Sequence, residues 1–431
     1  MLNVDIVVKK CLCHGCGTCY AVCQKNAIDM KYNEEAGHFT PVINENCINC
    51  SLCLKVCPGY ELDVERLDNV ISKTQPENSN VGVFTDCYVG YSTNPDIRFD
   101  SASGGLITQI LVTLLEEKMI TGALVTSMNP TDPMVPMAIL ATSKEEIIEA
   151  SKSKYCPVTL ADALKLVMKT DGRYAVVGLP CHIHGLRKAE QQFPQLRKKV
   201  VIRLGLLCSH MVGFPGIEFL LSKIGTSHSS LAKMQYRGRG WPGSMLIKNK
   251  NREVKIIPLV TGWNSYWPIF SSYFFTPIRC MMCPDQMAEL ADMSFGDAWL
   301  PAYFSDKIGQ SIVISKNYFS DNILREMTRK GQINLRQLPV HEIEKSQQPN
   351  LVFKKIDIGA RIALLSKYNQ NVPILNPQPK VNLSFISVLR TLLVLNSYWL
   401  SNKTIFRRIG VYIPFPLFRL YSGCFKYLYK I

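Results

Sequence analysis

The cysteine run CLCHGCGTCYAVCQ (residues 11–24) decides the fold of the N-terminal part of the chain, because CINCSLCLKVCP (residues 47–58) repeats its spacing. Both runs follow C-x2-C-x2-C-x3-C. In this spacing three thiolates of one run wrap a 4Fe-4S cluster, and the fourth reaches the cluster held by the other run. The sequence therefore predicts two clusters. Cluster one has the ligands Cys13, Cys16, Cys19 and Cys57, and cluster two has Cys47, Cys50, Cys53 and Cys23.

A zinc site and chance are the alternatives to iron–sulfur clusters in the duplicated runs. Zinc sites usually combine two C-x2-C pairs or include histidine, so the duplication favours iron and sulfide. Gln24 stands where a proline often follows the fourth cysteine, and Cys11 is more readily a bystander than a ligand. Clusters in tandem carry one electron at a time, which predicts an electron conduit.

Length and composition bound the rest of the chain. With 431 residues, 47% of them apolar and 19% charged, we expect two or three packed domains. The start, MLNVDIVVKKC, lacks the apolar core and small-residue cleavage site of a signal peptide, so we expect a cytoplasmic protein with reduced cysteines. Under reducing conditions, metal binding accounts for sixteen cysteines better than a disulfide framework does.

A polar stretch, LDNVISKTQPENSN (67–80), separates the cysteine runs from a region in which strand-like and helix-like apolar segments alternate. This alternation predicts a substantially parallel sheet, whereas MLIKN and VKIIPL are typical of a hairpin. The expected fold class is α+β. It comprises a two-cluster ferredoxin-like domain (1–66), a larger mixed α/β domain (81–357) and a basic, mostly helical C-terminal tail (358–431).

Three short segments of the α/β domain are candidates for a nucleotide cofactor. SASGG (101–105) precedes a helix whose free N–H groups could hold a phosphate, although small residues at a helix start are more often an ordinary cap. SKSKY (151–155) contributes two lysines, and YRGRGWPG (236–243) contributes Arg237, Arg239 and Trp241. Taken singly, each of these two basic segments is better explained as a solvated basic loop.

Four further cysteines stand in apolar or turn-like surroundings: Cys181, Cys208, Cys280 and Cys283, the last two as C-x2-C. Spacing alone leaves zinc, iron–sulfur, a redox dithiol and buried packing cysteines open.

The order of SASGG, SKSKY, GLPCHIHGLRK, GLLC, RCMMCPDQMAELADMSFGDAW and GQSIVI resembles the beta subunits of coenzyme F-420 hydrogenases and dehydrogenases. The resemblance extends from about Cys13 to Ile314, and the long RCMMC segment is its most specific part. It implies ferredoxin-type clusters and an FAD-binding α/β domain. It also implies that Cys181, Cys208, Cys280 and Cys283 hold a third 4Fe-4S cluster near the flavin.

The same resemblance implies flavin contacts by Ser103, Gly104 and Gly105, with Lys154 and Tyr155 near the same pocket. Arg237 is a further expected cofactor contact. Asp297, in GDAW, is expected to bind a ribityl hydroxyl or orient the ring, or else to stabilise a turn. No catalytic residue is assigned, and His182, in place of the family's glutamine, is more readily a solvent-facing or satisfied histidine than a proton donor.

The expected activity is oxidoreduction. A flavin exchanges electrons singly with clusters and in pairs with hydride carriers, so it would join the clusters to a deazaflavin (coenzyme F-420) or to a small-molecule substrate. Some relatives are associated with surface polysaccharide synthesis, where a ferredoxin-like carrier would supply the electrons. The alternative is an electron-transfer subunit that feeds a partner enzyme.

The C-terminal tail has a composition of its own. After Asp357 there are ten Lys and Arg and no acidic residue, and cations interrupt every apolar run of membrane-spanning length. Basic and aromatic amphipathic stretches suit an anionic membrane surface at the inner face of a membrane, or a helical appendage docked on the protein or a partner subunit. No base-reading motif accompanies the basic pI, so nucleic acid is not expected as a partner.

Overall fold

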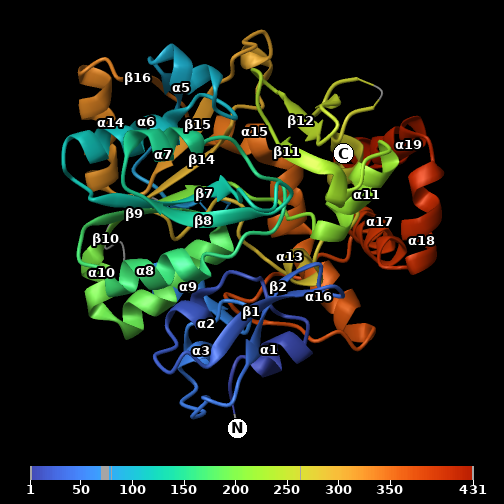
Figure 1. Cartoon of the computed structure of the whole chain (residues 1–431). Helices are drawn as coiled ribbons and strands as arrows, with labels where there is room; N and C mark the ends of the chain where they lie inside the picture. Colours follow the sequence, from blue (N-terminus) through green and yellow to red (C-terminus); the bar gives the residue numbers. More distant parts are fainter. Residues whose placement is uncertain (1, 69–76, 79, 263, 430–431) are drawn as a thin grey trace.

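The computed structural model describes residues 2–68, 77–78, 80–262 and 264–429, so the polar stretch 67–80 lies mostly outside the described residues. The N-terminal module consists of a hairpin and short helices that carry the cysteine runs (Figure 1). Strands β1 and β2 pair antiparallel, from Ile28 opposite Ile43 to Asn33 opposite His38. The elements are α1 (Asp5–Lys9), α2 (Thr18–Ala21), β1 (Ile28–Asn33), β2 (His38–Ile43), α3 (Leu52–Lys55), β3 (Glu61–Asp63) and α4 (Val64–Asp68).

The two cysteine runs bend in the same way. Gly17 (φ 82°) precedes α2, which carries Cys19, and Ser51 (φ 60°) precedes α3, which carries Cys53. Both residues have a left-handed backbone, which turns the chain sharply before the helix. At position 17 a side chain would also meet the backbone nitrogen of Ala161 at 2.6 Å, so this turn requires glycine. Such a bend is what closely spaced ligands need in order to wrap around one centre.

An eight-stranded mixed sheet forms the middle of the larger domain, in the order β16-β6-β15-β14-β10-β9-β7-β8. Strands β14, β10, β9 and β7 are parallel, as the alternation of segments predicted. Strands β8, β15, β6 and β16 each lie antiparallel to their neighbours, a direction that the alternation did not predict. The strands are β6 (Asp86–Ser92), β7 (Gly122–Met128), β8 (Pro136–Ala141), β9 (Tyr174–Gly178), β10 (Val200–Leu206), β14 (Met293–Asp297), β15 (Ser311–Ser315) and β16 (Ile333–Gln337).

Helices cover both faces of this sheet (Figure 1). Ile110, Leu204 and Val313 belong to the apolar core on one face, and Leu164 and Leu186 to the core on the other. Burial of these side chains from water is the main force that holds the layers together. One face carries α5 (Pro95–Phe99), α6 (Leu106–Glu116), α7 (Lys144–Glu149) and α14 (Tyr318–Arg329). The other carries α8 (Ala161–Lys169), α9 (Pro180–Gln192) and α10 (Pro194–Lys199).

A three-stranded antiparallel sheet lies beside the large one. Its β12 and β13 form the hairpin expected from MLIKN and VKIIPL, with Ser244 opposite Pro258, which confirms that prediction. Strands β4 (Glu77–Asn78) and β5 (Gly82–Val83) form a separate short pair. The elements of this region are α11 (Phe214–Lys223), β11 (Leu231–Gln235), β12 (Ser244–Asn249), β13 (Val254–Pro258), α12 (Trp267–Ser271) and α13 (Ile278–Met281).

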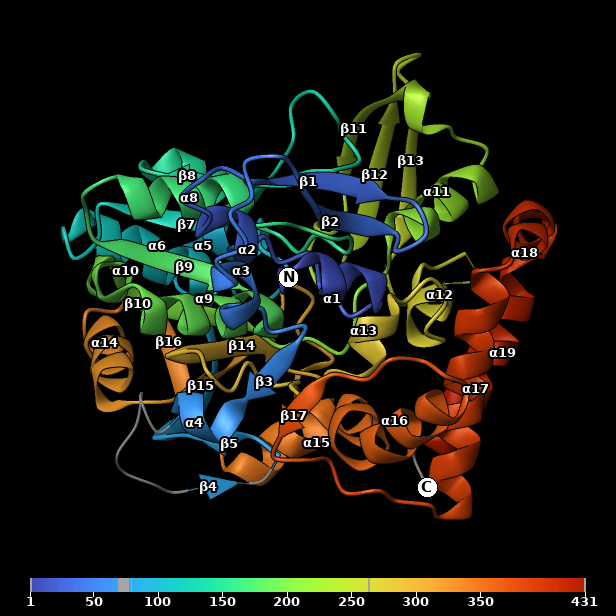
Figure 2. The ribbon, with the colours of Figure 1, turned by 90° about the horizontal axis from the view of Figure 1, so that it is seen from below.

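The C-terminal segment packs back onto the body of the molecule (Figure 2). Strand β17 joins β3 of the N-terminal module in parallel, with Ile374 opposite Glu61. Further on, the buried guanidinium of Arg390 donates to the carboxylate of Asp357 at 2.8 and 3.0 Å. The elements are α15 (Val340–Leu351), a π-helical turn (Val352–Ile356), α16 (Ile358–Lys367), β17 (Ile374–Asn376), α17 (Phe385–Ser401), α18 (Thr404–Ile409), the 3-10 turn η4 (Gly410–Tyr412) and α19 (Phe415–Leu428). Of the helices in the described residues, none has the length and apolarity needed to cross a bilayer.

Candidate functional site: three cysteine sets and the edge of the sheet

The first cysteine set, Cys13, Cys16, Cys19 and Cys57, surrounds a cavity in the N-terminal module. Burial, and after it the nearby charge of Cys16, raises the pKa of the Cys57 thiol to about 11. The backbone N–H of Gly15 donates to the sulfur of Cys13 over 3.3 Å. Four thiols around one space are the arrangement that a cubane cluster requires.

The second cysteine set, Cys47, Cys50, Cys53 and Cys23, lies nearer to the surface. Cys50 is exposed and the other three are half-buried. Burial raises the pKa of Cys53, and the charges of Cys50 and Cys47 raise it further, so these three thiols are close neighbours. The sulfur of Cys23 accepts the Ala27 N–H at 3.3 Å, and its membership of this set stays a prediction.

The third cysteine set, Cys181, Cys208, Cys280 and Cys283, is brought together from three distant segments. Cys181 follows β9 and Cys208 follows β10, and the carboxyl ends of these parallel strands meet at one edge of the sheet. Cys280 lies in α13, with Cys283 directly after it. Burial raises the pKa of Cys181 well above its usual value, and the charges of the other three thiols raise it further. The four cysteines therefore form one group.

The three sets lie in a definite order. Cys53 of the second set is among the charges that raise the pKa of Cys19 in the first set, after burial and the first set's own thiols. Cys16 of the first set contributes in the same way to the pKa of Cys181 in the third. The first set thus stands between an outer set near the surface and an inner set at the edge of the sheet.

A buried histidine–carboxylate pair ties two parts of the third set together. His184 Nε2 lies 2.7 Å from Asp285 Oδ2, and both side chains are 1% exposed. His184 is on α9, one turn beyond Cys181, and Asp285 is two residues beyond Cys283. The pair therefore joins the helix that begins at Cys181 to the loop that carries Cys283.

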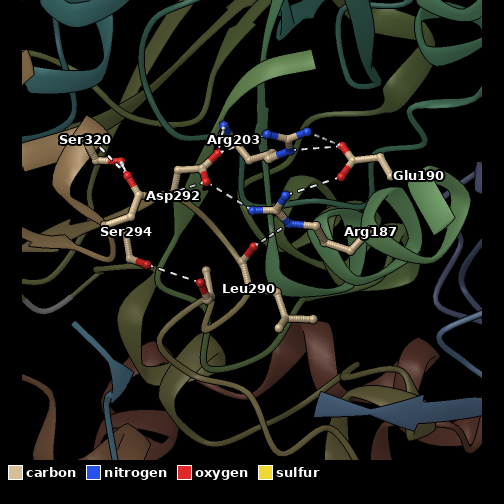
Figure 3. A network of polar contacts seen from close by, with 9 residues as sticks. Arg187, Glu190, Arg203, Leu290, Asp292, Ser294 and Ser320 are labelled. Carbon is tan, nitrogen blue, oxygen red and sulfur yellow. Dashed lines mark hydrogen bonds and ion pairs between the residues drawn. The ribbon is translucent and has the colours of Figure 1, made fainter. Parts of the chain in front are cut away.

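A second buried network joins α9 to β10 and to the residue before β14 (Figure 3). Arg187 of α9 donates to Asp292 at 3.1 Å and to Glu190 at 3.3 Å. Arg203 of β10 donates to Glu190 at 2.7 Å, and its backbone N–H donates to Asp292 at 2.7 Å. Two guanidinium groups thus alternate with two carboxylates between α9, β10 and the start of β14. Although Arg187 and Asp292 stand within the family motifs, no role was predicted for them from the sequence.

Three cations lie among the thiols, and none of them was predicted from the sequence. Arg279, 1% exposed, donates to three backbone carbonyls, two of which directly follow Cys57. Lys354 donates to the carbonyl of Cys280 at 3.4 Å, and Lys188 to that of Cys57 at 3.1 Å. Buried thiolates need such counter-charges, because an unpaired charge is costly away from water. Arg279 was signalled by its place beside Cys280, whereas nothing in the sequence marked Lys354.

Arg237, Asp297 and Tyr155 meet at the same edge of the sheet. Asp297 ends β14, and its carboxylate accepts two hydrogen bonds from Arg237 at 2.8 and 3.0 Å. Arg237 also donates to the hydroxyl of Tyr155 at 3.0 Å, and Trp241 Nε1 donates to Asp297 at 3.2 Å. Segments that were weak candidates singly are thus joined by charge-assisted hydrogen bonds.

The other expected cofactor residues hold the neighbouring loops. Ser103 donates to the carbonyl of Gln310 at 2.6 Å, and the Gly104 N–H donates to Ser311 Oγ at 2.9 Å. A side chain at Gly104 would meet the carbonyl of Gly90 at 2.4 Å, and Gly105 has a φ of 75°. Lys154 donates to the carbonyls of residues 150 and 151, and burial lowers its pKa to about 7. Ser103 and Gly104 thus tie the loop before α6 to the start of β15, whereas Lys154 bonds within its own loop.

A row of aromatic rings connects this edge with the third cysteine set. The ring of Tyr155 lies 5.8 Å from that of Phe270, which stacks on His210 at 4.2 Å. His210 follows Cys208 by two residues, and its Nε2 lies 3.0 Å from the Phe270 carbonyl. Burial lowers the pKa of His210 to about 3, so the ring is neutral and Nε2 donates to that carbonyl. His182 is also a satisfied, neutral histidine, since its Nδ1 accepts the Leu179 N–H at 3.2 Å.

The cysteine sets suit iron–sulfur clusters, because their thiolates are the usual ligands, the cysteines are grouped, and cations lie nearby to compensate their charge. In the described part of the chain, no three His, Cys, Asp or Glu side chains converge on the position of a single metal ion. The side chains expected to contact a flavin fit it less directly. Arg237 and Asp297 use their hydrogen-bonding groups on each other, and Ser103 and Lys154 donate to backbone carbonyls. At this edge of the sheet, the exposed Arg239 and the backbone of the glycine-rich turn 238–243 are available to contact a flavin.

Family models match most of the chain. Residues 87–165 and 171–340 match the N-terminal and C-terminal parts of the coenzyme F420 hydrogenase/dehydrogenase beta subunit. Residues 12–60 match a 4Fe-4S dicluster domain. These ranges cover all three cysteine sets.

Named relatives are similar over long stretches. The chain is 27% identical to a coenzyme F420-dependent sulfite reductase of Methanocaldococcus jannaschii, over 82% of this chain but only 51% of that protein, so it spans about half of that relative's length. It is 25% identical to a coenzyme F420 hydrogenase subunit beta of Methanosarcina barkeri, over 63% of this chain and 93% of that one. A chain of the F420-reducing [NiFe] hydrogenase complex of Methanosarcina barkeri shares the fold, with a TM-score of 0.52 and 20% identity over 70% of this chain and 99% of that one.

Proposed function

The chain belongs to the coenzyme F420 hydrogenase/dehydrogenase beta-subunit family, and on that premise we propose that it is an iron–sulfur flavoprotein oxidoreductase. It would pass electrons between a carrier, either a ferredoxin-like protein or a deazaflavin, and a small-molecule substrate. The relatives carry the names of oxidoreductases, which supports the reaction class.

The serial arrangement of the cysteine sets is the observation that carries this proposal. The second set begins at the surface with the exposed Cys50, the first set lies inward, and the third stands where β9 and β10 end. We assign a 4Fe-4S cluster to each set. The chain would thereby hold three one-electron carriers in line, with its surface end open to a donor and its inner end at the edge of the sheet.

We place FAD at that edge, beside Tyr155 and the Arg237–Asp297 pair. A bound flavin would supply the exchange between single electrons and hydride pairs. Arg237 is held rigid by its bonds to Asp297 and Tyr155, and exposed Arg239 offers a positive charge for a pyrophosphate. The rings of Tyr155, Phe270 and His210 pack against one another between this place and Cys208.

The carrier and the substrate are proposed from the relatives alone. Several relatives are named for coenzyme F420, which supports a deazaflavin as the carrier. In a host without this coenzyme we propose a ferredoxin-like donor and reduction of a carbohydrate or another small molecule, as in surface polysaccharide synthesis. The named hydrogenase relatives are subunits, which favours a second candidate, an electron-transfer subunit that feeds a partner enzyme.

Anaerobic purification with quantification of iron, sulfide and flavin tests the proposal. We expect about twelve irons and one FAD per chain, and about eight irons in Cys181→Ala, in which the third cluster has lost a ligand. Cys87→Ala, a buried cysteine of β6 outside the three sets, is the matched control and should keep all the iron. About eight irons without flavin in the wild type would refute the flavoenzyme and leave the electron-transfer subunit.

A further inference from the structure

The C-terminal helices combine an inward apolar face with an outward one. On α19, Phe418 and Phe425 are buried among residues of the body. On the other side of the helix, Leu417, Leu420 and Tyr427 are 52%, 71% and 69% exposed. Their spacing of three and seven residues places them on one helical face. Packing inside the protein therefore accounts for one side of α19 and leaves the other without a role.

The segment before α19 repeats this feature. Ile405 and Ile409 of α18 are 67% and 57% exposed, and Tyr412 of η4 is 83% exposed. Helices α17, α18 and α19 together form one margin of the molecule, away from the eight-stranded sheet (Figure 2). A gathering of large apolar side chains on one margin is unlike the scattered exposure that is normal on a soluble surface.

The chain segment that forms this margin carries charge of one sign. Residues 358–431 contain ten of the 49 Lys and Arg of the chain and none of its 34 Asp and Glu. Lys403, Arg408 and Lys426 are exposed in the same stretch of the chain as these apolar side chains. Apolar, aromatic and cationic side chains on one segment match a surface that is apolar inside and anionic outside.

We propose that α18, η4 and α19 form a docking surface for an anionic lipid membrane, independently of the oxidoreductase assignment. Ile405, Tyr412 and Leu420 enter the boundary between headgroups and acyl chains, and Lys403, Arg408 and Lys426 lie at the level of the phosphates. The helices lie on the membrane and do not cross it, in keeping with their length. The redox body, anchored through the Asp357–Arg390 pair and through β17, stays on the same side of the bilayer.

Sedimentation of the full-length holoprotein with vesicles tests this surface. We expect binding to vesicles of phosphatidylcholine mixed with phosphatidylglycerol, about tenfold weaker binding to phosphatidylcholine alone, and weaker binding as salt is added. Leu420→Asp, and separately the triple variant Lys403→Glu, Arg408→Glu and Lys426→Glu, should each reduce binding about tenfold with unchanged iron content. Tyr318→Asp is the matched control, an equally exposed aromatic on α14 at the opposite margin, and should bind like the wild type.

Three outcomes would overturn the proposal. The first is wild-type protein that stays in the supernatant with both kinds of vesicle. The second is Leu420→Asp that binds as tightly as the wild type. The third is a dimer, seen by light scattering, that Leu420→Asp dissociates, because the margin is then an interface between two copies of this chain.

Discussion

The N-terminal module and the third cysteine set present the same kind of ligand in opposite ways. In the module, each run of eleven residues from first to last cysteine carries its own spacing and its own left-handed turn before a short helix. The third set spans residues 181–283 and is gathered by strands β9 and β10 and by α13. The first arrangement depends on local geometry, and the second on the whole sheet.

This difference shows where the stabilising interactions have to lie. A local run needs little beyond its own turns and backbone N–H groups, such as that of Gly15. The dispersed set is held by the His184–Asp285 pair and by the Arg187–Glu190–Arg203–Asp292 network, all of them buried. Substitutions outside the cysteines should therefore damage the third set far more than the module.

The largest effect is expected from Asp292→Ala. This change leaves Arg187 and Arg203 buried with one carboxylate between them, and breaking such a pair costs about 3–5 kcal/mol of unfolding free energy. We expect a lower apparent Tm and loss of about four irons, with the module's clusters retained. Thermal unfolding and iron analysis measure both. Glu117→Ala, which breaks the exposed pair with Lys330, is the control and should change neither. A normal iron content in Asp292→Ala would show that the network does not hold the third set.

A smaller effect is expected from Arg279→Gln, which removes a cation near Cys57, Cys280 and Cys283. Without this charge the reduced, more negative cluster is less stable, so the reduction potentials of the first and third clusters should fall by about 60 mV, a tenfold change for one electron. A redox titration followed by electron paramagnetic resonance measures the shift. The second cluster should keep its potential, and Arg279→Lys, which retains the charge, should restore most of the difference. An equal shift in all three clusters would contradict a local electrostatic effect.

A smaller effect again is expected from Lys154, on the pH dependence of the unfolding free energy. Burial lowers its pKa to about 7 from an ordinary value near 10, so between these limits the unfolded chain binds a proton that the folded chain does not. Unfolding free energy should therefore rise with pH from about 7 to about 10, and should not change on this account below pH 7. Apparent Tm at a series of pH values measures the slope. Lys154→Met should remove this contribution, and an unchanged slope in that variant would assign it to other groups.

The smallest effect is expected from Cys11→Ala. Cys11 is exposed and lies outside the repeated spacing, so iron content and potentials should stay as in the wild type. Cys50→Ala, an exposed cysteine inside the spacing, is the matched comparison and should lose the second cluster. Iron loss in Cys11→Ala would mean that the spacing does not select the ligands of the module.

Much of the fold was predictable because its signals are local or follow from alternation. The parallel centre of the sheet and the β12–β13 hairpin were both expected, and both are confirmed. The flanking strands were not: β15 returns antiparallel directly after β14, and β6 pairs with β15 from a segment more than two hundred residues earlier. The counter-charges Arg279 and Lys354 also escaped prediction, since a buried cation looks like a surface one until the fold surrounds it.

By itself, the sequence determined the two repeated cysteine runs, the family motifs and the unbalanced charge of the tail, because each is a matter of spacing or composition within a short segment. Only the tertiary structure decided that Cys16 lies near Cys181, that Arg237 is neutralised by Asp297, and that β17 returns to the N-terminal module. The physical reason is that such contacts join residues tens to hundreds of positions apart. Their existence depends on how all the apolar faces of the chain are buried together, which no single segment encodes.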